Sequence, residues 1–121
     1  MSLSASLEFS YLKRTLLFRF EAGTSRGVMH TRDVFWIKVH RKGDLNQIGW
    51  GEAAPLAGLS PDFGPDFETQ LRRVLKEASA RSWELEEESV LQQVKNLVPF
   101  SLPSIRFGLE TAFLDLINGI N

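Results

Sequence analysis

The sequence predicts an α+β domain in which a three-stranded antiparallel meander comes first and a bundle of about three helices follows. Hydrophobic residues recur at every second position between residues 7 and 54, and with a period of 3.6 from residue 65 onward. Strands and helices are therefore segregated along the chain rather than alternating. With 121 residues, of which 43% are hydrophobic, the chain has the length and composition of one globular domain.

Three runs predict the strands. The first region carries aromatic and aliphatic residues at alternate positions, in two short runs separated by polar residues: Phe9, Tyr11, Leu16, Phe18 and Phe20. The second run spans 34–39, and the polar segment 41–46 after it predicts a hairpin connection. The third run spans 48–53 and contains Gly49 and Gly51, and glycine inside a strand is typical of a bulge or of a close approach by another backbone.

The helical half begins after Pro65. Its first helix presents an apolar stripe at helical spacing: Phe67, Leu71, Val74, Leu75 and Ala78. Asp62, Asp66 and Glu68 crowd the start of this helix, where the positive end of the helix dipole favours acidic side chains. A weaker second helix is predicted over 89–98 and is ended by Pro99. Glu84 and the run 86–88 read as the solvated start of that helix.

A third helix opens at Pro103, because proline suits a first helical turn, and Gly119 is its expected stop. Its apolar stripe continues almost to Asn121 without a polar tail. This ending predicts that the natural chain continues beyond Asn121, and we treat residues 1–121 as one domain.

Composition excludes several classes of protein. The chain has no cysteine, so disulfides, thiolate nucleophiles and cysteine metal sites are absent. Its 14 basic and 15 acidic residues give a net charge of −1 without a basic cluster, which argues against a nucleic-acid partner. No apolar run is long enough to cross a membrane, and no secretory signal is present. We therefore expect a cytoplasmic protein that binds neither nucleic acid nor membrane.

Catalytic and metal-binding patterns are absent. His30 and His40 have no acidic neighbour at a metal-ligand spacing, so both are predicted to lack a catalytic role. Ser60 lacks the second glycine of a nucleophile elbow and is predicted to be a turn serine. We accordingly assign no catalytic residue and no metal ligand to this chain.

Two loops are the candidate functional segments. The first loop, 21–31, brackets hydroxyls and an arginine with glycines, which suits it to grip an anionic group; the alternative is a flexible loop whose arginine meets only solvent. The second loop, 53–60, is unusually apolar, which predicts contact with a ligand or a partner surface; the alternative is a loop folded under the helices. The candidate site residues are Thr24, Ser25, Arg26, Gly27, Val28, Met29, Leu56, Ala57, Gly58, Leu59 and Ser60.

Four motifs carry a resemblance to a known family. They are Gly-Thr-Ser-Arg-Gly-Val at 23–28, Ile-Gly-Trp-Gly-Glu-Ala-Ala-Pro-Leu at 48–56, Gly-Leu-Ser at 58–60 and Pro-Ser-Ile-Arg-Phe-Gly-Leu-Glu-Thr-Ala-Phe-Leu-Asp-Leu at 103–116. With these motifs in this order, the chain resembles the amino-terminal capping domain of the enolase superfamily. More narrowly it resembles the o-succinylbenzoate synthase family, in the branch related to muconate lactonizing enzyme.

The resemblance implies a division of labour between two domains. The capping domain closes over a modified barrel, and its two loops form a lid that helps to select a small dicarboxylate substrate. The complete enzyme would be a lyase that dehydrates a cyclohexadiene carboxylate with Mg²⁺ in menaquinone synthesis. Its catalytic lysines and three acidic metal ligands would lie in the barrel, downstream of Asn121, so Glu52 and Glu110 are expected to be structural and this chain alone to be inactive.

Further expectations follow for the lid. Arg26 is expected to pair with a substrate carboxylate, while apolar side chains pack on the substrate's ring or aliphatic part; these are Val28, Met29, Leu56 and Leu59. Without a barrel, apolar surface would be left uncovered and the chain would self-associate loosely. Two other functions stay open: a capping domain of a dipeptide epimerase or N-acylamino acid racemase, and a stand-alone binding or interaction module.

Overall fold

A computed structural model describes residues 4–20 and 28–119, and for residues 18–20 and 28–30 it describes the backbone alone. The fold is α+β, as predicted. Four antiparallel strands form one open sheet in the order β3-β2-β1-β4. They are β1 (Ser4–Phe20), β2 (Val28–Arg41), β3 (Gly49–Ala53) and β4 (Ser82–Glu84).

The predicted count of three strands was wrong, because β4 pairs with the start of β1 from Ser4↔Glu84 to Ser6↔Ser82. Glu84, which was predicted to open a helix, therefore lies in a strand. Trp83 accounts for this strand: its side chain is buried and its indole nitrogen Nε1 donates a hydrogen bond of 2.8 Å to the Ala78 carbonyl. A strand of three residues is too short to show a period of two.

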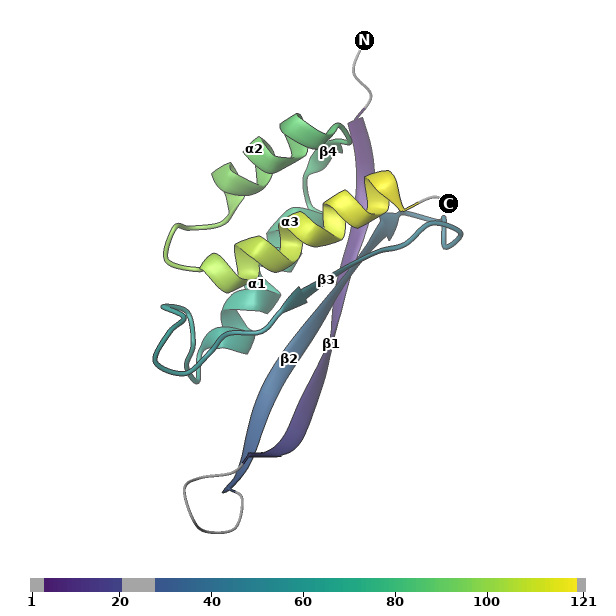
Figure 1. Ribbon diagram of the computed structural model, residues 1–121. Helices are drawn as coiled ribbons and strands as arrows, with labels where there is room; N and C mark the ends of the chain where they lie inside the picture. The colour runs from purple at the N-terminus through teal and green to yellow at the C-terminus, as the bar shows by residue number, and fades with distance from the viewer. Residues whose placement is uncertain (1–3, 21–27, 120–121) are drawn as a thin grey trace.

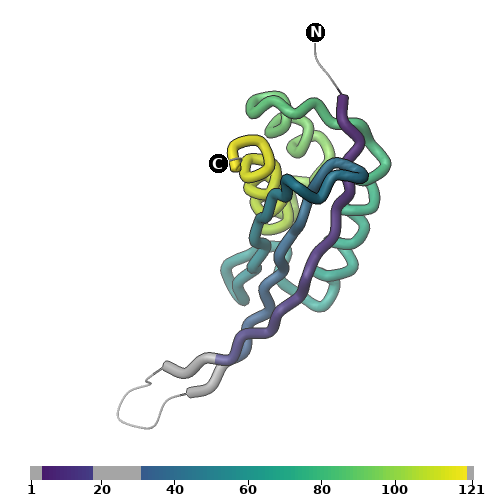
Figure 2. Tube along the Cα trace, turned by 90° about the vertical axis from the view of Figure 1, so that its right-hand side faces the viewer, coloured from purple at the N-terminus to yellow at the C-terminus, as the bar shows by residue number. Residues whose placement is uncertain are grey.

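β1 and β2 are longer than the sequence predicted. β1 runs through the polar residues 13–15 without a break, and β2 already begins at Val28, paired with Phe20. Val28 and Met29, which were predicted in the first loop, are thus part of a strand. The two strands extend as a long hairpin beyond the helices (Figures 1 and 2). This end of the hairpin, residues 13–20 and 28–33, is called the arm below; at its base, Lys13 still pairs with Glu68 on α1.

Three helices cover one face of the sheet (Figure 1): α1 (Phe67–Ser79), α2 (Glu87–Leu97) and α3 (Pro103–Asn118). The predicted apolar stripe of α1 is buried, and Gly119 follows the last turn of α3 as predicted. Trp83 and Phe113 are buried in the core between the layers, with their ring centroids 4.6 Å apart. The partly buried Phe9 packs against both rings. None of the helices in the described ranges is long and apolar enough to cross a bilayer.

α3 lies unusually close to β3 because glycines face it. A Cβ atom on Gly51 would overlap the Gly108 carbonyl oxygen and lie 2.6 Å from the Ala112 backbone nitrogen. A Cβ atom on Gly49 would lie 2.7 Å from the backbone nitrogen of Leu116. The predicted close approach of another backbone is therefore confirmed, and it fixes α3 directly over the strand that leads into the second loop.

Candidate functional site

The second loop is closed by hydrogen bonds of its own. The Leu59 and Ser60 amides donate to the Leu56 carbonyl at 3.1 and 2.8 Å. In return, the Ser60 hydroxyl oxygen accepts a bond of 2.7 Å from the Leu56 amide, which confirms Ser60 as a turn serine. Gly58 has a φ of +77°, a backbone conformation that is unfavourable for residues with a side chain. Glycine at this position therefore allows the turn to close. The loop therefore has one defined shape.

Two side chains attach this loop to the rest of the domain. Arg32 on β2 donates from Nη2 to the Ala54 carbonyl at 2.9 Å, just after β3 ends. On the other side, the Asp62 carboxylate accepts from the backbone amides of Ser104 and Ile105 at 2.9 and 3.2 Å. The loop is thus held between the sheet and the first turn of α3.

The position of Asp62 corrects the sequence prediction, which placed it at the start of α1. Residues 61–66 turn back on themselves, so that the side chain reaches the start of α3 instead. The residue before α3, Leu102, offers no side-chain acceptor to the free amides of the first turn. Asp62 supplies that acceptor and is itself only 8% exposed.

Two cavities flank the loop, and different loop residues line each of them. The first, called the arm cavity, has a volume of about 530 Å³; around it lie Lys13, Thr31, Arg32, Asp33, Phe35, Pro55, Leu56, Ala57, Phe63, Gly64, Pro65, Phe67 and Glu68. The second, called the α3 cavity, has a volume of about 560 Å³ and is lined by Arg32, Glu52, Ala54, Leu59, Ser60, Pro61, Pro103, Ser104 and Phe107. Leu59 is 78% exposed, so the loop is not folded under the helices.

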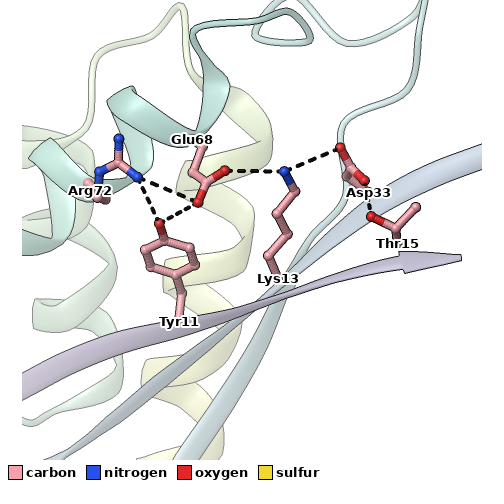
Figure 3. Close-up of polar contacts among 6 residues, drawn as sticks. All are labelled: Tyr11, Lys13, Thr15, Asp33, Glu68 and Arg72. Atoms are coloured by element: carbon pink, nitrogen blue, oxygen red, sulfur yellow. Dashed lines mark hydrogen bonds and ion pairs between the residues drawn. The ribbon is translucent and has the colours of Figure 1, made fainter.

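A ladder of polar side chains crosses from β1 and β2 to α1 (Figure 3). Three of its members line the arm cavity: Lys13, Asp33 and Glu68. The Tyr11 hydroxyl donates to the Glu68 carboxylate at 2.7 Å, and Arg72 Nη1 lies 3.5 Å from the same carboxylate. Lys13 Nζ lies 3.3 Å from Glu68 and 3.9 Å from Asp33. This ladder, completed by a bond of 2.7 Å from the Thr15 hydroxyl to Asp33, joins the base of the arm to the helical layer.

The contacts within the ladder shift the pKa values of Glu68 and Tyr11 in opposite directions. The hydrogen bond from Tyr11, together with the positive charges of Lys13 and Arg72, holds the pKa of Glu68 below its ordinary value, although burial opposes this shift. Burial is the main cause that raises the pKa of Tyr11, and its bond to the negative Glu68 adds to it. Both groups are therefore in their usual forms near neutral pH, a neutral phenol donating to a carboxylate.

The lowered pKa of Glu68 predicts a pH-dependent contribution to stability. The stabilisation is present above the ordinary pKa of 4.5 and is lost as the pH falls through the lowered pKa of the folded chain. We expect Glu68→Gln to lower the free energy of unfolding by about 1 kcal/mol or less near neutral pH. The difference from the wild type should vanish in acid, measured by urea titrations across pH. Glu77→Gln on the exposed side of α1 is the control, and an equal loss for both variants would refute the role of the ladder.

The first loop lies mostly outside the described residues. Thr24, Ser25, Arg26 and Gly27 fall in the range 21–27, so the structure does not test their predicted role. Of Val28 and Met29 only the backbone is described, in β2. The structure therefore places five of the eleven candidate site residues with their side chains: Leu56, Ala57, Gly58, Leu59 and Ser60.

Two further titratable residues singled out from the sequence, His40 and Glu110, have partners within the domain. His40 is 7% exposed, with Nδ1 2.8 Å from the Arg41 carbonyl and Nε2 3.8 Å from Glu8. Glu110 pairs with Arg106 at 3.7 Å. Among residues 4–20 and 28–119, no group of three or more histidines and carboxylates is placed to hold a metal ion. The donors needed for Mg²⁺ are thus not assembled in this part of the chain.

The comparisons with solved structures show the fold: the chain has the fold of the amino-terminal capping domain of the enolase superfamily. A crystal structure of an enolase superfamily member from Roseovarius nubinhibens superimposes with a TM-score of 0.55 at 18% identity, covering 97% of this chain and 30% of that one. MenC from Desulfotalea psychrophila superimposes with a TM-score of 0.64 at 21% identity, covering 93% of this chain and 35% of that one.

By sequence, the chain is similar to an o-succinylbenzoate synthase from Desulfotalea psychrophila. It is 29% identical over 136 aligned residues, covering 95% of this chain and 36% of the relative. No protein-family model matches the chain. The chain spans about a third of the length of this curated relative. The match confirms the resemblance to the o-succinylbenzoate synthase family that the motifs indicate.

Proposed function

We propose that this chain is the specificity-setting capping domain of an enzyme like o-succinylbenzoate synthase. The observation that carries the proposal is the match to that enzyme over 95% of this chain. The exposed, preformed second loop supports it, because the loop presents apolar side chains beside two cavities of small-molecule size.

In this proposal the second loop forms one wall of the substrate pocket. Leu56 and Leu59 pack on the apolar part of a small dicarboxylate and exclude water, while Arg26 of the first loop pairs with a carboxylate. The dehydration itself, with its Mg²⁺ ion and its catalytic lysines, belongs to a barrel domain. The described residues of this chain do not assemble a metal site, so no step of the reaction is assigned to them.

Fusion to a barrel tests this proposal. The barrel region of the Desulfotalea psychrophila o-succinylbenzoate synthase, freed of its own amino-terminal region, would be joined to this chain. We expect the chain alone to be inactive and to self-associate in sedimentation, and the fusion to dehydrate the cyclohexadiene carboxylate substrate. The barrel rejoined to its own capping region at the same junction is the positive control.

The loop is then tested within the fusion. Leu59→Asp is expected to lower kcat/KM by about tenfold or more, because it places a charge where an apolar contact is proposed. Phe100→Asp is the matched control, since Phe100, between α2 and α3, is also exposed but lines neither the arm cavity nor the α3 cavity. An inactive fusion beside an active positive control would overturn the proposal. Activity only on dipeptides or N-acylamino acids would favour the epimerase or racemase alternative.

A further inference from the structure

Arg32 is a half-buried cation that has no counter-ion among the described residues. Its Nη2 donates to the Ala54 carbonyl, and its Nε is buried with no hydrogen-bond partner in the part of the chain that the structure describes. None of the ion pairs among the described residues includes it. A guanidinium that is partly removed from water without a carboxylate partner is costly, so this position favours an anion brought by another molecule.

The neighbouring cations do not share this property. Lys13 is matched by Glu68 and Asp33, and Arg72 is matched by Glu68. Because the arm cavity is lined by both of those carboxylates, an anion entering it meets two negative charges. Of the cations that line either cavity, Arg32 alone lacks a carboxylate partner among the described residues.

The α3 cavity is the better site for an anion beside Arg32. Its wall holds the hydroxyls of Ser60 and Ser104, both able to donate. The first turn of α3 adds no free amide there, because the Asp62 carboxylate accepts from the Ser104 and Ile105 amides. Glu52 is the one carboxylate among its lining residues. Leu59 and Phe107, both more than half exposed, supply apolar surface at the same cavity.

We propose that Arg32 is a carboxylate-binding residue, which together with the hydroxyls of Ser60 and Ser104 anchors a small aromatic or aliphatic acid in the α3 cavity. The bond to the Ala54 carbonyl holds the guanidinium in place, so that its remaining donors are oriented before the ligand arrives. The apolar body of the acid lies against Leu59 and Phe107. The inference rests on the proposed function only in the claim that the second loop meets the substrate.

Titration of the chain with sodium benzoate, followed by two-dimensional NMR at constant ionic strength, tests this inference. Benzoate is expected to shift the amide signals of Leu59, Ser60 and Ser104 together with the side-chain signal of Arg32. Benzyl alcohol, which has the same ring without the charge, is expected to leave them unchanged. A response to benzyl alcohol equal to that to benzoate would show apolar binding only, and would overturn the proposal.

Three variants test whether the positive charge of Arg32 binds the carboxylate. Arg32→Gln keeps a donor for the Ala54 carbonyl but loses the charge, and is expected to weaken benzoate binding at least tenfold. Arg73→Gln, exposed on α1 and outside both cavities, is the matched control and should bind as the wild type does. Glu52→Gln removes the opposing carboxylate and is expected to strengthen binding about threefold, a result that stands even if Arg32→Gln fails to fold.

The outcomes distinguish this inference from the proposed function. Unshifted signals in benzoate, wild-type affinity in Arg32→Gln or unchanged affinity in Glu52→Gln would each overturn the role of Arg32. None of these results would change the outcome of the barrel fusion, which depends on the domain as a whole. Conversely, an inactive fusion with specific benzoate binding would overturn the enzyme proposal and leave the carboxylate site in place.

Discussion

Replacing Gly51 with alanine is expected to cost at least about 3 kcal/mol of folding free energy, a large share of the 5–15 kcal/mol that typically stabilises a domain. The new Cβ atom would overlap the carbonyl oxygen of Gly108 and lie 2.6 Å from both the Ala112 nitrogen and the Thr111 hydroxyl oxygen. Two of these atoms belong to the α3 backbone and cannot swing aside as the end of a long side chain would. Relief therefore requires the whole helix to move away from β3.

Urea denaturation of wild type and variant measures this cost. Gly43→Ala is the matched control, because Gly43 has open space around it but a φ of +79°. Its alanine variant should lose only about 1 kcal/mol, the cost of the left-handed backbone. If Gly51→Ala were no less stable than Gly43→Ala, the close contact between β3 and α3 would be refuted.

The close contact also has a consequence for the site. Displacement of α3 would separate the Asp62 carboxylate from the Ser104 and Ile105 amides, and so release one attachment of the second loop. Trp50 reinforces the same interface, since its amide donates to the Asp115 carboxylate at 2.8 Å. The glycines of β3 thus influence the second loop indirectly, because they determine where α3 lies and α3 holds Asp62.

Periodicity predicted the long elements because burial on one face imposes a period on the sequence. It failed in two places where burial leaves no repeating pattern in the sequence. β4 is held by one buried residue, Trp83. The arm continues through Lys13 and Thr15, whose polar side chains are matched by Asp33 and Glu68 rather than buried in the core. Polar partners on another element leave no periodic signal.

The second loop could be found from its composition, whereas its attachments could not. An apolar loop is visible in the sequence, and its exposure is confirmed. Arg32 binds a backbone carbonyl, which carries no sequence signature. Asp62 caps a helix through the amide of Ser104, which lies 42 residues further along the chain. For Asp62 the nearest helix in sequence was the wrong one, because only the tertiary fold shows which amides are free.

Replacing Asp62 with alanine is expected to be the most damaging single change within the second loop's attachments, lowering the free energy of unfolding by about 2–3 kcal/mol. The loss is large because the carboxylate is buried and accepts from two amides, and alanine would leave the Ser104 and Ile105 amides without a partner. Asp62→Asn keeps one acceptor oxygen without the charge, so about half of that loss is expected.

Asp66→Ala supplies the matched control for this prediction. Asp66 lies directly before α1, where a capping role would be assumed, but its side chain makes no capping hydrogen bond. Its removal should therefore cost only a few tenths of a kcal/mol. Hydrogen exchange adds a local readout: in Asp62→Ala the Ser104, Ile105 and Ser60 amides should exchange faster than in the wild type, while the core strands keep their protection. Equal losses for Asp62→Ala and Asp66→Ala would show that the loop is not held through α3.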